Sequence, residues 1–153
     1  MAAKPAGSKA DRMIAALDGF SAGPDDYGAE ADLYDLTKGF DRLPPADKAR
    51  VVPAMFRLME RCPDADLGDP GPLVHAIEEL GAGAYEPLLV DSLRRRPMYL
   101  SVWMVNRILN VEPAGPRRES LLGLLREARD NPKYPDAAAE AARFLEDQAG
   151  EDP

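Results

Sequence analysis

The chain of 153 residues is predicted to fold as an all-α protein. Apolar residues recur at spacings of three and four along most of the sequence, and no segment keeps a period of two over the length of a strand. Prolines are frequent, 15 of 153 residues, and many stand where a helix would begin. At this length we expect one domain over residues 1–153, with residues 1–7 and 149–153 frayed.

The apolar spacing predicts eight helices joined by short connections. They span about residues 8–18, 28–40, 46–61, 70–80, 84–95, 98–110, 116–129 and 135–148. Ser8 and Asp69 are predicted N-caps, because their side-chain oxygens can accept from the first free backbone amides of a helix. Pro53 is expected to kink or split the third helix. The short connections require neighbouring helices to pack antiparallel.

A loose internal repeat predicts how these hairpins assemble. PLLVDSLRRRP at 87–97 resembles SLLGLLREARDNP at 120–132, and RIL at 107–109 returns as RFL at 143–145. A period of 33 to 36 residues with two helices per unit is typical of an α-solenoid, in which stacked hairpins bury the faces that one hairpin leaves exposed. We therefore predict an α-solenoid of about four antiparallel hairpins, with an irregular bundle as the alternative.

Composition restricts the location and the partners. The net charge is −8 and the pI about 4.7, which argues against binding to phosphate backbones and suits a basic partner. Cys62 is the single cysteine, so no internal disulfide forms and a reducing compartment is expected. The N-terminal residues lack the apolar region of a secretion signal, and no apolar run reaches membrane-spanning length. We expect a cytoplasmic protein without membrane contact.

The only histidine, His75, lies in DPGPLVHAIEEL at 69–80 and is followed by Glu78 and Glu79. The apolar stripe of this predicted helix excludes all three side chains, which places them on its other faces. One histidine with two carboxylates on one helix leaves a zinc or di-iron site short of ligands, and no nucleophile or cofactor loop accompanies them. We therefore predict no catalytic residues, no metal and no cofactor, and a surface role for this set.

A run of acidic residues surrounds the same helix. From Cys62 to Leu93 there are seven acids and no Lys or Arg: Asp64, Asp66, Asp69, Glu78, Glu79, Glu86 and Asp91. Such a window is either a solvated surface that keeps the chain in solution or a field that speeds encounter with a basic partner. Under the second interpretation the partner-binding candidates are Asp69, His75, Glu78, Glu79, Glu86 and Asp91.

The most apolar predicted helix, PMYLSVWMVNRILN at 97–110, has one polar stripe. Trp103, Asn106, Arg107 and Asn110 are spaced to share one face. Trp and Arg are enriched among interface hot spots, so Trp103, Asn106 and Arg107 are further partner-binding candidates. The alternative is that Trp103 anchors the core and Arg107 pairs with a neighbouring acid. Arg117 and Arg118 open the next helix, where cations are mildly unfavourable, and the sequence gives no structural reason for this pair.

Three strings of this sequence together resemble a known family. GDPGPLVHAIEEL, YEPLLVDSLRRRP and VWMVNRILN resemble small bacterial HEAT-like immunity proteins, which are encoded beside polymorphic or contact-dependent toxins. The resemblance covers residues 68–110 and, more loosely, the C-terminal hairpin. It implies a HEAT-like solenoid without enzymatic activity that binds and neutralises a cognate toxin. His75, Trp103, Asn106 and Arg107 fall inside the shared strings.

These observations lead to one functional hypothesis and two alternatives. The chain is expected to be an immunity protein that blocks a toxin domain sterically and electrostatically, and a basic nuclease toxin would suit the charge. The first alternative is a helical-repeat adaptor that binds a different bacterial protein. The second is a helical-repeat enzyme, although a glycosylase of this type needs a basic groove that a net charge of −8 does not favour. The oligomeric state stays open.

Overall fold

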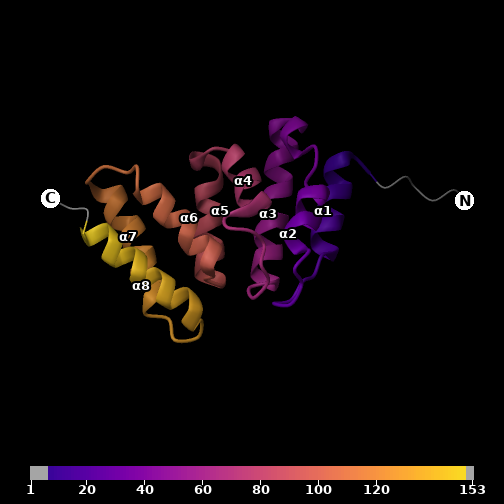
Figure 1. The fold of residues 1–153 in the computed structure, drawn as a ribbon. Helices are drawn as coiled ribbons and strands as arrows, with labels where there is room; N and C mark the ends of the chain where they lie inside the picture. The colour runs from indigo at the N-terminus through magenta and orange to yellow at the C-terminus, as the bar shows by residue number, and fades with distance from the viewer. Residues whose placement is uncertain (1–6, 151–153) are drawn as a thin grey trace, which may run out of the picture. The chain divides into compact units, whose positions relative to one another are not determined.

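The computed structural model describes residues 7–150, and within that range the chain is helical with no strand (Figure 1). This confirms the all-α prediction. The helices are α1 (Lys9–Gly19), α2 (Ala29–Leu36), the 3-10 helix η1 (Phe40–Arg42), α3 (Pro45–Arg61), α4 (Gly71–Glu79), α5 (Ala82–Arg95), α6 (Tyr99–Leu109), α7 (Pro116–Arg129) and α8 (Pro135–Gly150).

Helix starts follow the predicted chemistry at α1 but not at α4. Ser8 caps α1 in a capping box: its hydroxyl accepts from the Asp11 amide at 3.2 Å, and the Asp11 carboxylate accepts from the Ser8 amide at 3.1 Å. The predicted cap at Asp69 is wrong. Pro70 occupies the N-cap position of α4, without a side-chain cap, so Asp69 lies one residue upstream of the position from which a cap acts.

The predicted helix over 28–40 is too long, because α2 ends at Leu36. The Thr37 hydroxyl donates to the Leu33 carbonyl at 2.8 Å, and Gly39 adopts a left-handed conformation with φ of 88°. A residue with a Cβ is strained at that angle, which is why glycine stands there. The reversal turns Phe40 into the core, where it is 2% exposed.

Of the two effects predicted for Pro53, splitting of α3 is wrong, whereas kinking stays a prediction. The helix runs without a break from Pro45 to Arg61. A proline inside a helix removes one backbone hydrogen bond and costs about 3 kcal/mol. Val52, Ala54 and Met55 on either side of it are fully buried. Each such burial contributes on the order of 1–3 kcal/mol, so packing outweighs the local cost and holds the helix together.

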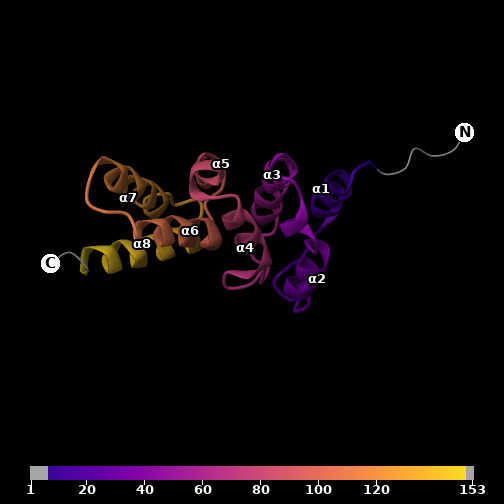
Figure 2. The same cartoon turned by 90° about the horizontal axis from the view of Figure 1, so that it is seen from above.

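Unit 1, residues 1–88, has its own core. Within it α1 packs on α3, α2 packs on both α1 and α4, and α3 packs on α4 (Figure 2). The side chains buried at its centre include Leu17, Leu33, Phe56, Leu73 and Ile77. Arg57 makes two hydrogen bonds of 3.1 Å to the Asp18 carboxylate, and these tie α3 to α1 at the rim of this core.

Unit 2, residues 89–153, is formed by the end of α5 and by α6, α7 and α8, which pack on one another. Its core includes Met104, Leu109, Leu125, Ala141 and Phe144. The prediction of one domain over residues 1–153 stays a prediction. The predicted fraying of 1–7 and 149–153 falls mostly outside the described residues, and α8 extends two residues past its predicted end, to Gly150.

Replacing Pro53 by alanine should stabilise unit 1. Alanine restores the missing backbone donor in the middle of α3, and we expect the free energy of unfolding to rise by about 1–3 kcal/mol. Urea denaturation followed by circular dichroism measures this. Pro45→Ala is the matched control, because proline at the first helical position sacrifices no hydrogen bond and its replacement should change stability little. Equal effects of the two substitutions would contradict this account of α3.

Candidate functional site

His75 and its neighbours lie on α4, with His75 and Glu79 exposed and Glu78 half-buried. The Glu79 carboxylate forms an ion pair with Lys48 of α3, with 3.7 Å between Oε2 and Nζ. Within residues 7–150, no group of three or more His, Cys, Asp or Glu side chains is placed to hold a metal ion. Of the predicted apolar stripe, Leu73, Ala76 and Ile77 are buried and Leu80 is half-buried, and Val74, which lies outside that stripe, is buried as well.

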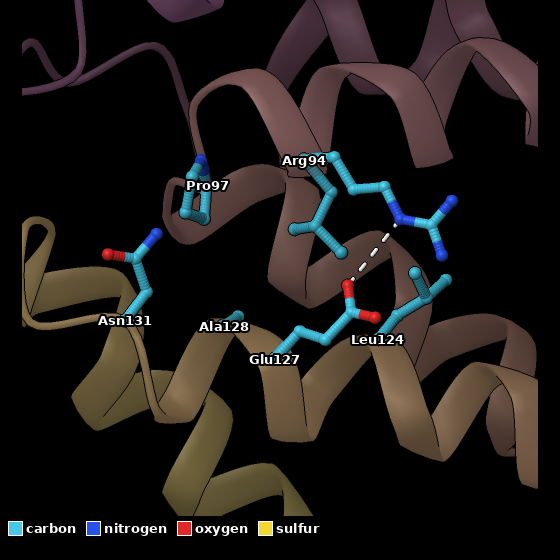
Figure 3. A pocket seen from close by; sticks show the side chains of 7 residues that line it. Arg94, Pro97, Leu124, Glu127, Ala128 and Asn131 are labelled. Atoms are coloured by element: carbon cyan, nitrogen blue, oxygen red, sulfur yellow. Dashed lines mark hydrogen bonds and ion pairs between the residues drawn. The ribbon is translucent and has the colours of Figure 1, made fainter.

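A small pocket lies in unit 2 between the end of α5 and α7 (Figure 3). Arg94 and Glu127 close one side of it through an ion pair of 3.4 Å. Leu93, Pro97, Leu124, Ala128 and Asn131 supply the rest of its lining. Its volume is about 100 Å³, whereas sites for small organic ligands measure roughly 300–1,000 Å³, so this pocket is too small for one.

Most of the acidic window is exposed. Asp64, Asp66, Asp69 and Glu79 are exposed in unit 1, and Asp91 is exposed in unit 2. Glu78 and Glu86 are half-buried. The loop of residues 62–70 is held in part by its own acids, since the Asp66 carboxylate accepts from the Gly68 amide at 3.1 Å. The charge predicted for this window therefore does reach the surface of the molecule.

A second acidic stretch, which the sequence reasoning missed, lies beside the first in unit 1. Residues 13–37 contain six acids and no Lys or Arg. Three of the six, Glu30, Asp32 and Asp35, lie in α2, which packs on α4. The Glu30 carboxylate lies so close to Gly68 that a Cβ there would be 3.1 Å from it. A search of the whole sequence for segments without Lys or Arg would have found this stretch. Only the packing shows that the two stretches adjoin.

The net charge is almost entirely that of unit 1. Residues 1–88 contain sixteen acidic and nine basic side chains, a net charge of −7. Residues 89–153 contain eleven and ten, a net charge of −1. A partner attracted by the charge of this chain would therefore be attracted to unit 1.

Four cations of unit 1, all on α3, form ion pairs with carboxylates outside α2. The pairs are Arg50 with Asp11 and Asp47, Arg57 and Arg61 with Asp18, and Lys48 with Glu79. The hydrogen bond from Arg50 lowers the pKa of Asp11. In the part of the chain that the structure describes, no such pair reaches Asp25, Asp32 or Asp35, all of which are exposed. The charge of α2 is thus left for solvent or for another molecule.

The polar stripe of α6 is divided between surface and interior. Trp103 is half-buried, and the exposed guanidinium of Arg107 lies 5.3 Å from the centre of its ring. Asn106 is half-buried and Asn110 is exposed, and the side-chain oxygens of both accept from the Gln148 amide of α8, at 2.9 and 2.8 Å. Of the three candidates on this stripe, only Arg107 is exposed.

Gln148 and Arg118 form a hydrogen-bond network that the sequence did not reveal. Gln148 is 3% exposed, and its oxygen accepts from Arg118 at 2.7 Å. Arg118 also donates to the carbonyls of Leu109 and Glu112, at 2.8 and 3.2 Å, so it caps the C-terminal end of α6. Arg117 pairs with Glu112 at 3.0 Å. The sequence offers no structural role for Arg117 and Arg118, but in the folded chain both make stabilising contacts.

Comparisons with protein-family models, with curated proteins and with solved structures found no match to this chain. The family resemblance of residues 68–110 therefore stays a hypothesis. Among the described helices, none has both the length and the apolar character that crossing a membrane requires.

Gln148→Leu should destabilise unit 2 by about 3 kcal/mol. The substitution removes three hydrogen bonds and leaves the Arg118 guanidinium and two asparagine oxygens short of a partner in a partly buried site. Thermal and urea denaturation measure the loss. Glu146→Ala, at an exposed position of the same helix, should stay within about 0.5 kcal/mol of the parent. A Gln148→Leu variant as stable as the parent would show that these hydrogen bonds contribute nothing to the stability of unit 2.

Proposed function

We propose that this chain is an immunity protein that binds a cognate bacterial toxin in the cytoplasm and neutralises it by steric and electrostatic blockade, without turnover. The observation that carries the proposal is the joined acidic surface of unit 1, where α2 and the loop of residues 62–70 adjoin. Neither of these two segments contains Lys or Arg, so their carboxylates repel one another. A basic partner relieves that repulsion when it binds.

The proposal includes a HEAT-like solenoid of about four hairpins. Contacts between alternate helices support it: α1 with α3 and α2 with α4 in unit 1, and α6 with α8 in unit 2. The Arg94–Glu127 pair brings α5 beside α7 in the same manner. In solenoids of helical hairpins, first helices stack on first helices and second on second, and the surface so formed binds proteins.

The proposed contacts lie on both units. On unit 1 they are Asp69, His75, Glu78, Glu79 and Glu86, and on unit 2 they are Asp91, Trp103, Asn106 and Arg107. The charge of unit 1 would steer the toxin, and the Trp103–Arg107 pair would supply an aromatic and cationic contact of the type found at hot spots. A basic nuclease domain is the toxin that this charge fits best.

Co-expression with the product of the adjacent gene tests the proposal. If that product is a toxin, it should arrest growth alone, co-purify with this chain, and lose its toxicity when this chain is present. A product that does not bind, or that binds and stays toxic, would refute the immunity function. Binding of a non-toxic product would instead favour the adaptor.

Neutralising the acidic surface should slow association with that toxin. We expect Asp32→Asn, Asp35→Asn and Asp64→Asn together to lower the association rate constant roughly tenfold at low ionic strength and to flatten its salt dependence. Stopped-flow measurements at several salt concentrations give both quantities. Glu146→Gln with Asp147→Asn, two exposed acids of α8, is the control and should leave both nearly unchanged. Equal effects of the two sets would contradict steering by unit 1.

A further inference from the structure

Two tyrosines on or beside α2 are turned to solvent. Tyr34 is 49% exposed, and Tyr27, in the turn that leads into the helix, is 91% exposed. Ala31 lies between them in the sequence and is also exposed. Ala29 and Leu33, by contrast, are buried and hold α2 on its neighbours. The helix therefore buries one face in the core, while Tyr34, Ala31 and, in the turn before it, Tyr27 are exposed and not used by the core.

Within unit 1, the structure gives these two rings no partner. Among residues 7–150, neither tyrosine hydroxyl takes part in a hydrogen bond, and no cation lies over either ring, although four other aromatic side chains of the chain have one. A large amphipathic ring exposed to this extent contributes little to folding. Tyrosine is, however, enriched at interface hot spots, because it offers a large rigid contact area with a polar end.

The surroundings of the tyrosines decide which partner fits. Exposed carboxylates of Asp25, Asp26, Asp32 and Asp35 flank them. The nearest cations in the sequence are Arg12 and Lys38. An arginine of another protein could lie over a tyrosine ring and pair with an adjacent carboxylate at the same time. A phosphate-bearing partner would be repelled here. So would a second copy of unit 1, whose net charge is −7.

We infer that Tyr27, Ala31, Asp32, Tyr34 and Asp35, here termed the α2 face, form the binding site for an arginine-bearing protein segment. The tyrosines supply the apolar contact and the aspartates pair with the guanidinium groups. This inference rests on the proposed function insofar as the segment belongs to the toxin, and it moves the centre of binding from residues 64–91 to α2.

The first experiment needs no toxin. The ¹⁵N-labelled full chain is titrated with a synthetic helical peptide containing arginine and leucine, and with the same peptide carrying glutamate in place of arginine. We expect amide shifts confined to residues 25–36 with the arginine peptide and none with the other. Tyr27→Ser with Tyr34→Ser should weaken binding of the arginine peptide at least tenfold, whereas Val111→Ser, at an 84% exposed apolar position in unit 2, should not.

Shifts spread over all the acidic segments, or a dissociation constant unchanged in the double tyrosine variant, would overturn the inference. Circular dichroism checks that the variants fold, which is expected because both rings lie outside the core. Self-association of the chain that disappears in the double variant would identify a second copy as the occupant and would also overturn it.

The second experiment separates this inference from the proposed function. If the adjacent gene product binds and is neutralised but the double tyrosine variant binds it equally well, the α2 face is refuted and the immunity function stands. If that product does not bind while the arginine peptide maps to residues 25–36, the immunity function fails and the α2 face stands.

Discussion

Burial of one narrow apolar stripe per helix is the constraint on which the surface of this molecule depends. In α2, Ala29 and Leu33 must face the neighbouring helices, and this turns Asp32, Tyr34 and Asp35 outward. Burying one leucine side chain contributes about 2 kcal/mol, whereas a surface charge contact is worth roughly 0–1 kcal/mol. The core therefore decides where the charges go, and repulsion among them is tolerated.

The resulting charge distribution is uneven in a way that matters for binding. The arginines of α3 are occupied by Asp11, Asp18 and Asp47, so they hold α1 and α3 together without neutralising α2. At physiological ionic strength a charge is screened beyond about 8 Å, so only acids that adjoin act together on an approaching partner. The packing of α2 on α4 provides that closeness.

Polar side chains of unit 2 link its helices to one another. Gln148 joins α8 to Asn106 and Asn110 of α6, and Arg118 joins it to the end of the same helix. A buried amide with its hydrogen bonds satisfied is stable where an unpaired one would be costly. Residues that look like an exposed recognition stripe in the sequence thus serve in part as internal links.

Periodicity and proline placement were enough to predict all eight α-helices and their order, because local apolar spacing and the missing amide of proline act within a few residues. The same local rules wrongly allowed a split at Pro53, where packing keeps α3 continuous. They also failed at Gly39, whose left-handed turn brings Phe40 inward. The sequence by itself determined the all-α class and the exposure of much of the acidic window. Only the tertiary structure decided that α2 lies beside α4 and Gly68, that Tyr27 and Tyr34 face outward, and that Arg118 reaches Gln148. Those outcomes depend on contacts between residues far apart in the chain, and local spacing does not encode them.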